Sequence, residues 1–213
     1  MQRRAAETRD RLLDAAAAVL DARGYDGASL ADILDSAGLT KGALYHHFPS
    51  KAALVRALID DQFSPELAKP AVADLPLVHV AEVTVQAMIA AAEDVRFRAA
   101  FGVIVDRPHA DLGPVDRPIE EWTRTFSGLF RDAAQRGHLG DGIAPPAAAR
   151  SVVAEVIGQF CLARSATTER SGVAATAEFW RGFFGQCVPP RWRDEHLRAV
   201  DVILERHASP DQR

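Results

Sequence analysis

The segment at residues 29–48, SLADILDSAGLTKGALYHHF, constrains the fold more than any other part of the 213-residue chain. Ser29 is suited to cap a short helix, because its hydroxyl accepts hydrogen bonds from backbone N–H groups at a helix start. Apolar residues then recur at spacings of three and four, as on one face of a helix: Leu30, Ile33, Leu34 and Ala37. Gly38 predicts the end of this helix, since glycine adopts the left-handed conformation without a clash from a Cβ atom.

A second short helix is predicted directly after this turn. Thr40 caps it, and it spans about two turns because Pro49 disfavours helical geometry at Phe48. Ser50 then caps a further helix. Two short helices joined by a glycine turn cannot bury a core alone, so they must pack on neighbouring helices and leave an outer face exposed.

The outer face of the second helix has the character of a recognition helix. Leu44 and Phe48 point inward, whereas Lys41 lies at the N-terminus, where an ammonium meets a phosphate or a guanine edge. Gly42 allows the backbone to approach the bases closely. The alternative is an ordinary helical hairpin with solvated polar residues. The predicted DNA-binding residues are Arg9, Ser29, Thr40, Lys41, Gly42, Ala43, Tyr45, His46, His47 and Lys51.

The run from Thr8 to Leu58 resembles the N-terminal domain of the TetR family of transcriptional repressors, on the glycine turn and the segment YHHFPSK. The string TKGALYHHFPSKAAL is most similar to the γ-butyrolactone receptors of actinomycetes, although His46 stands where those receptors usually have phenylalanine or tyrosine. That departure bears on the operator sequence more than on the fold. The resemblance implies a repressor that a small-molecule effector releases from its operator.

The net charge of −4 and the pI near 6.0 are unusual for a nucleic-acid binder. Basic residues nevertheless gather at the N-terminus as Arg3, Arg4, Arg9 and Arg11, which form either a DNA-facing surface or a solvated, frayed end. We expect a cytoplasmic protein, because neither a signal peptide nor a membrane span is recognisable. Cys161 and Cys187 are more typical of small buried side chains than of a redox switch.

The remaining sequence predicts helices and no sheet, so the expected fold class is all-α. A helix-turn-helix DNA-binding domain is expected at residues 1–49, and a ligand-binding and dimerisation domain at 50–213, with a connecting helix at 50–68. Proline and glycine mark the helix boundaries. The predicted helical runs are 5–24, 50–67, 78–93, 95–106, 116–137, 146–168, 173–186 and 191–208. No spacing typical of a catalytic or metal site is present, so we expect neither an enzyme nor a cofactor.

Two late helical runs are apolar on more than one side, which predicts a partner on each side. In proteins of the TetR family, two late helices of each subunit form a four-helix dimer interface, and these runs suit that role. The alternative is a core formed within one chain. A two-fold dimer reads a palindromic DNA operator with half-sites about 34 to 36 Å apart. The predicted interface residues are Phe160, Phe179, Phe183 and Phe184.

The resemblance also implies an effector pocket in the larger domain. Trp122 matches a tryptophan beside the ligand of γ-butyrolactone receptors, and Gln62 matches the glutamine that meets the polar end of the ligand. A plain core aromatic and a surface amide are the alternatives. Weaker candidates are Met88, Phe101, Phe126 and Gln159. Such a pocket suits a small lactone or furan with an alkyl tail. The competing hypotheses are an efflux regulator that binds diverse lipophilic compounds and, less favoured, an α-helical enzyme or interaction module.

Overall fold

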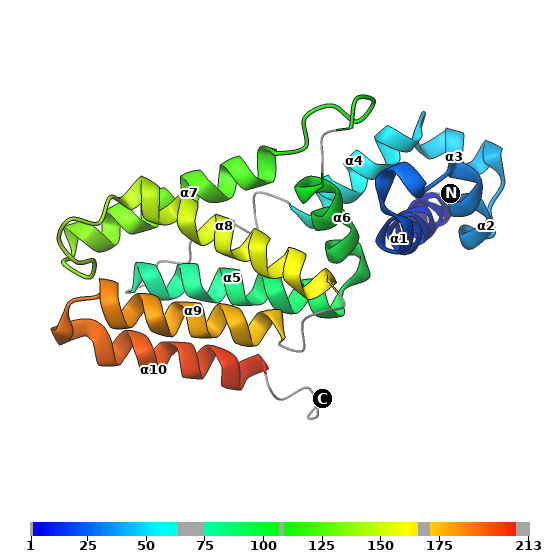
Figure 1. Cartoon of the computed structure of the whole chain (residues 1–213). Coiled ribbons are helices and arrows are strands. Elements are labelled where there is room, and N and C mark those ends of the chain that lie inside the picture. The colour runs from blue at the N-terminus through cyan, green and yellow to red at the C-terminus, as the bar shows by residue number, and fades with distance from the viewer. Residues whose placement is uncertain (1, 64–74, 107–108, 166–170, 208–213) are drawn as a thin grey trace. The chain divides into compact units, whose positions relative to one another are not determined.

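The structure is a computed structural model that describes residues 2–63, 75–106, 109–165 and 171–207, with the side chain of residue 2 left out (Figure 1). Every regular element in these ranges is an α-helix, which confirms the all-α prediction. The helices are α1 (Gln2–Gly27), α2 (Leu30–Ala37), α3 (Lys41–His47), α4 (Lys51–Gln62), α5 (Pro76–Glu93), α6 (Val95–Val105), α7 (Arg117–Gln135), α8 (Pro145–Arg164), α9 (Gly172–Cys187) and α10 (Pro190–His207). None of these described helices is both long and apolar enough to cross a membrane.

The chain divides into two compact units, one formed by residues 1–67 and 90–118 and the other by residues 68–89 and 119–213. The first unit holds the helices α1 to α4 together with α6. Helix α4 packs on α1 and α6, and it buries Leu54, Val55, Leu58 and Ile59. Packing therefore groups α4 with the N-terminal helices, whereas the sequence assigned this connecting helix to the C-terminal domain.

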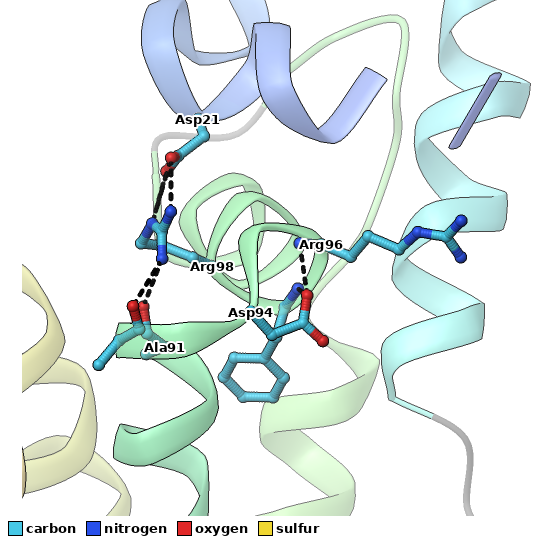
Figure 2. Close-up of polar contacts among 7 residues, drawn as sticks. Asp21, Ala91, Asp94, Arg96 and Arg98 are labelled. Atoms are coloured by element: carbon cyan, nitrogen blue, oxygen red, sulfur yellow. Dashed lines mark hydrogen bonds and ion pairs between the residues drawn. The ribbon is translucent and has the colours of Figure 1, made fainter. Parts of the chain in front are cut away.

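Arg98 fixes helix α6 to α1. The guanidinium of Arg98 donates to both carboxylate oxygens of Asp21 at 3.0 to 3.1 Å, and a second edge donates to the carbonyls of Ala91 and Ala92 near the end of α5. Figure 2 shows these contacts around the N-terminal turn of α6, whose first N–H groups are capped by Asp94. One side chain thus joins three helices, and its bidentate geometry fixes both distance and orientation.

The second unit is built around Trp180, whose side chain is fully buried on α9. Its indole Nε1 donates to Thr84 Oγ1 of α5 at 2.8 Å, and the Thr84 hydroxyl in turn lies 3.0 Å from the Val80 carbonyl oxygen. Helix α9 also packs on α8 and α10. The bond between the indole and the hydroxyl satisfies two buried polar groups, so the large apolar surface of Trp180 stabilises the core without an unpaired donor.

Two predicted helix ends differ from the structure. Helix α4 ends at Gln62 rather than near residue 67, because Phe63 has a non-helical φ of −119° and ψ of 43°. Helix α1 continues past its predicted end, although Gly24 interrupts it with a φ of 66° and ψ of 177°. The predicted helix ends near residues 168 and 208 lie outside the described residues, as do Pro65 and Pro70, which the sequence suggests as breaks after the connecting helix.

Candidate nucleic-acid interface

Helix α2 begins and ends as the sequence predicts. Ser29 Oγ accepts a hydrogen bond from the Asp32 N–H at 3.1 Å, and the Asp32 carboxylate accepts one from the Ser29 N–H at 3.2 Å. At the other end Gly38 is left-handed, with a φ of 61° and ψ of 39°. The Leu39 N–H then donates back to the Leu34 carbonyl at 3.1 Å. The reciprocal cap fixes the start of α2, and the glycine turn sets the direction in which α3 leaves it.

Helix α3 is short for the predicted reason. Thr40 Oγ1 accepts a hydrogen bond from the Ala43 N–H at 3.3 Å at its start. Phe48, the residue before Pro49, is extended with a φ of −136° and ψ of 118°, so the helix ends at His47. Leu44 and Phe48 are both buried, which confirms that this side of the helix faces the core.

The opposite side of α3 faces solvent. Lys41, Gly42, Tyr45 and His46 are exposed, with Tyr45 at 47% of its full accessibility, and Ala43 and His47 are half-buried. The Lys41 ammonium lies 5.8 Å from the centre of the Tyr45 ring. An ammonium, a phenol and two imidazoles therefore lie along one short helix, and each of these groups can donate a hydrogen bond to a phosphate oxygen or a base edge.

Gly42 has a particular role on this surface. A Cβ atom added to it would meet only Thr40 Oγ1, at 3.9 Å, which is an ordinary van der Waals contact. The fold therefore has room for a side chain at this position, and the packing of this chain does not require glycine. The lack of a side chain instead leaves the backbone of α3 open to a molecule that approaches its outer face.

Several predicted DNA-binding residues have structural roles in the fold. The ammonium of Lys51 is half-buried and donates to the carbonyls of Tyr25 and Ala28 at 2.8 and 2.9 Å, so the predicted phosphate contact of Lys51 does not fit this geometry. The Arg9 guanidinium lies 5.7 Å from the centre of the Phe48 ring. The hydroxyls of Ser29 and Thr40 serve as helix caps. The exposed residues of α3 thus remain the strongest candidates.

Sequence reasoning missed a polar cluster that surrounds the turn before α2. Tyr25 is buried, and its hydroxyl donates to the Asp111 carboxylate at 2.7 Å. Burial of the ring, followed by this bond, raises the pKa of the Tyr25 phenol, and the same bond holds the pKa of the Asp111 carboxyl below its usual value. His109 Nδ1 lies 3.2 Å from the Asp26 carboxylate. These partners are 86 and 83 residues apart, so no local pattern predicted them.

The predicted effector-binding residues are divided between the two units. Gln62 and Phe101 belong to the first unit, and Met88, Trp122, Phe126 and Gln159 belong to the second. The Gln62 amide donates to Asp61 at 3.0 Å, and the Gln159 amide donates to Glu155 at 2.8 Å. Trp122 is half-buried and stacks on Phe126 with ring centres 6.5 Å apart. Met88 and Phe101 are buried. Their joint role in one pocket stays a prediction.

The predicted interface residues differ in burial. Phe160 and Phe184 retain 1% and 0% of their accessibility in the single chain, so these two rings fit the alternative of a core formed within one chain. Neighbouring rings cover Phe184, because Trp180 and His196 both lie 5.1 Å from it. Phe179 and Phe183 are half-buried on α9. Only the latter two keep surface that a second copy can contact.

Comparison with known proteins identifies the family. Residues 12–58 match the bacterial regulatory proteins of the tetR family. The chain is 32% identical over 168 residues to the HTH-type transcriptional repressor BepR of Brucella suis biovar 1 (strain 1330), which covers 72% of this chain and 79% of BepR. The chain belongs to the TetR family. The resemblance that the sequence indicated is thereby confirmed, and α2 and α3 form the helix-turn-helix of this TetR-family chain.

Other similarities extend beyond the DNA-binding helices. The chain is 30% identical over 186 residues to the A-factor receptor protein of Streptomyces griseus, covering 84% of this chain. The match spans 63% of that receptor, which is less than two thirds of its length. A solved γ-butyrolactone receptor, described as an ArpA-like protein, is 25% identical, with a TM-score of 0.82 over 95% of this chain and 99% of that one. The relatives that are similar to this chain over both of its units therefore include a γ-butyrolactone receptor.

Proposed function

We propose that this chain is a transcriptional repressor that binds a palindromic double-stranded DNA operator as a homodimer and is released by a small-molecule effector. The observation that carries the proposal is the capped, exposed helix α3, with Lys41 at its start and bare backbone at Gly42. A helix with this surface fits the major groove of B-DNA, where its N-terminal residues contact base edges. The membership of this chain in a family of regulatory proteins supports the same function.

We propose a γ-butyrolactone-like compound as the effector. The similarity to a γ-butyrolactone receptor covers nearly the whole chain, including the unit that contains α7 to α10. Trp122 supplies a flat apolar wall, and the Gln62 amide supplies a donor for a lactone carbonyl. An efflux regulator that binds diverse lipophilic compounds remains the second candidate for the effector class, and a broad response to unrelated ligands would favour it.

The DNA-binding proposal is tested by fluorescence anisotropy with double-stranded DNA from the region beside the protein's own gene. A palindromic fragment should bind more tightly than a scrambled one, and the logarithm of its affinity should fall linearly with the logarithm of salt concentration. Equal affinity for both fragments would mean that the protein binds DNA without sequence specificity. Failure to bind either fragment would contradict the proposed function.

The effector proposal is tested by release of the same operator with a panel of alkyl γ-butyrolactones. Trp122→Ala removes a large apolar contact, and Gln62→Ala removes one hydrogen-bond donor worth about 0.5 to 1.5 kcal/mol. Both variants should bind the operator normally but need more ligand for release, because an effector acts only through its preference for the DNA-incompetent state. Gln135→Ala, at the exposed end of α7, is the matched control for Gln62. Release of both variants at the parent's ligand concentration would refute the pocket.

A further inference from the structure

The turn between α1 and α2 determines how the helix-turn-helix leaves the rest of its unit. Gly24 interrupts α1 with a φ of 66°, the helix resumes through Gly27, and Ser29 then caps α2. Any rotation about these few residues changes the direction of α2 and α3 together, because the tight turn at Gly38 joins those two helices into one element. Contacts that fix residues 24–28 therefore fix the recognition helix.

A segment between α6 and α7 provides such contacts. We call residues 109–113 the strap. Its Asp111 accepts the 2.7 Å hydrogen bond from the Tyr25 hydroxyl, and the ring of its His109 packs against the Tyr25 ring with centres 4.4 Å apart. Tyr25 and His109 retain only 2% and 8% of their accessibility. A second polar contact joins His109 Nδ1 to the Asp26 carboxylate at 3.2 Å. Two consecutive residues of the turn are thus held by the strap.

Helix α4 is bonded to the same turn and to the strap. Lys51 donates to the carbonyls of Tyr25 and Ala28, and its ammonium lies 4.0 Å from the centre of the Tyr25 ring. The Arg56 guanidinium donates to the Leu112 carbonyl of the strap. The turn, the strap and α4 therefore share one network of charged hydrogen bonds, in which each bond favours the geometry of the others.

Two pockets adjoin the chain that follows the strap. One of about 270 Å³ lies between this chain and α4, and it is lined by Arg56, Ile59 and Asp60 of α4, by Phe63 just after it, and by Pro114 and Val115, among others. A further cavity of about 550 Å³ is lined by Ile104, His109, Ala110, Gly113, Pro114 and Val115, among others. Open pockets adjoin the strap on this side, so its polar contacts act together with the burial of Leu112 and His109 to fix its position.

We infer that the strap holds the helix-turn-helix in its DNA-binding orientation, with Tyr25 and Asp111 as positioning residues; this inference rests on the proposed function. A recognition helix that is already oriented does not lose further conformational freedom when it binds, so it binds more tightly. The strap also connects directly to α7, which begins at Arg117, four residues after Gly113, and carries Trp122.

The inference is tested with two variants that each remove the Tyr25–Asp111 bond. Tyr25→Phe deletes only the hydroxyl, and the exposed Asp111→Ala deletes the acceptor. Each should raise the operator Kd about tenfold under conditions where the protein is fully folded, and the double variant should bind no more weakly than either single variant. Asp111→Asn keeps an acceptor oxygen and should bind within about threefold of the parent. Asp141→Ala, an equal change of charge at an exposed turn, is the control.

Two readouts separate this inference from the proposed function. Hydrogen exchange without DNA should be faster for the amides of α2 and α3 in Tyr25→Phe than in the parent, because the turn before them is less constrained. Unchanged exchange would overturn the strap whether or not the chain binds DNA. Lower thermal stability with an unchanged operator Kd would also overturn it, since the bond would then be structural alone. A parent that binds no operator would contradict the proposed function instead.

Discussion

Gly42→Ala is expected to stabilise the protein and weaken its binding to DNA. The added methyl group meets only Thr40 Oγ1 at 3.9 Å, and Gly42 does not have a positive φ, so the fold accommodates alanine without strain. Alanine in place of a helical glycine contributes up to about 1 kcal/mol to the free energy of unfolding. For a chain of this size that corresponds to a rise in melting temperature of about 2 to 4 °C.

On the outer face the same methyl group has the opposite effect. If the backbone at Gly42 lies against the bases, one additional methyl group in that close contact costs about 1 to 3 kcal/mol. The operator Kd should then rise roughly 5- to 150-fold. Thermal unfolding and fluorescence anisotropy on the same samples measure both effects, and opposite signs distinguish a lost DNA contact from general damage to the fold.

Gly128→Ala is a matched control in α7. A Cβ atom there also meets no other atom within 4 Å, so this variant should gain comparable stability and bind the operator like the parent. A folded Gly42→Ala protein with the parent's operator Kd would refute the assignment of α3 as the recognition helix. Equal losses of affinity in both variants would refute the argument that close approach is specific to Gly42.

Three other perturbations address separate parts of the molecule. Lys41→Ala should weaken binding to all DNA sequences and reduce the slope of log affinity against log salt by about one unit, and an unchanged slope would exclude a phosphate contact. Phe183→Glu introduces a charge at a half-buried position of α9 and should shift sedimentation towards monomer; a parent that sediments as a monomer at micromolar concentration would remove the basis for this prediction. Burial lowers the pKa of His138 and of His196 below 6.5. As the pH drops below about 6.5, the unfolded chain therefore takes up protons before the folded chain does. The free energy of unfolding should then fall by at most about 1.4 kcal/mol per pH unit for each histidine. Urea unfolding between about pH 7.5 and 5.5 measures this slope. The slope should be shallower in His138→Leu, and an unchanged slope would argue against a contribution from buried His138.

The helix-turn-helix could be predicted because each of its signals acts over a few residues. Ser29 and Asp32 form their cap within one turn, and Gly38 ends α2 through its own backbone conformation. By contrast, the role of Lys51 depends on carbonyls 23 and 26 residues away, and the partner of Tyr25 lies 86 residues away. A charged residue beside a predicted recognition helix fits both a DNA contact and an internal clamp, and only the fold distinguishes them.

The interpretation of the aromatic residues on α9 had a similar limit. A helix that is apolar on several sides needs a partner on each, but periodicity does not say whether the partner is the same chain or a second copy. The structure encloses Phe184 among rings of its own unit and leaves Phe179 and Phe183 half-buried. The two outcomes occur within six residues of one helix, so they are set by the direction of each side chain rather than by composition.

The acidic net charge of the chain is compatible with DNA binding because the charges near the phosphates matter more than the total, and several carboxylates of the first unit are paired with arginines within the fold. Asp14 and Asp21 pair with Arg96 and Arg98 of α6, at 2.7 and 3.0 Å. Asp32 accepts hydrogen bonds from Ser29 and lies 2.7 Å from Arg23, and these contacts hold the pKa of its carboxyl below its usual value. Charges farther than a Debye length of about 8 to 10 Å from a phosphate are largely screened. The attraction to DNA therefore depends on the exposed surface of α3, and its sign does not follow from the total charge of the chain.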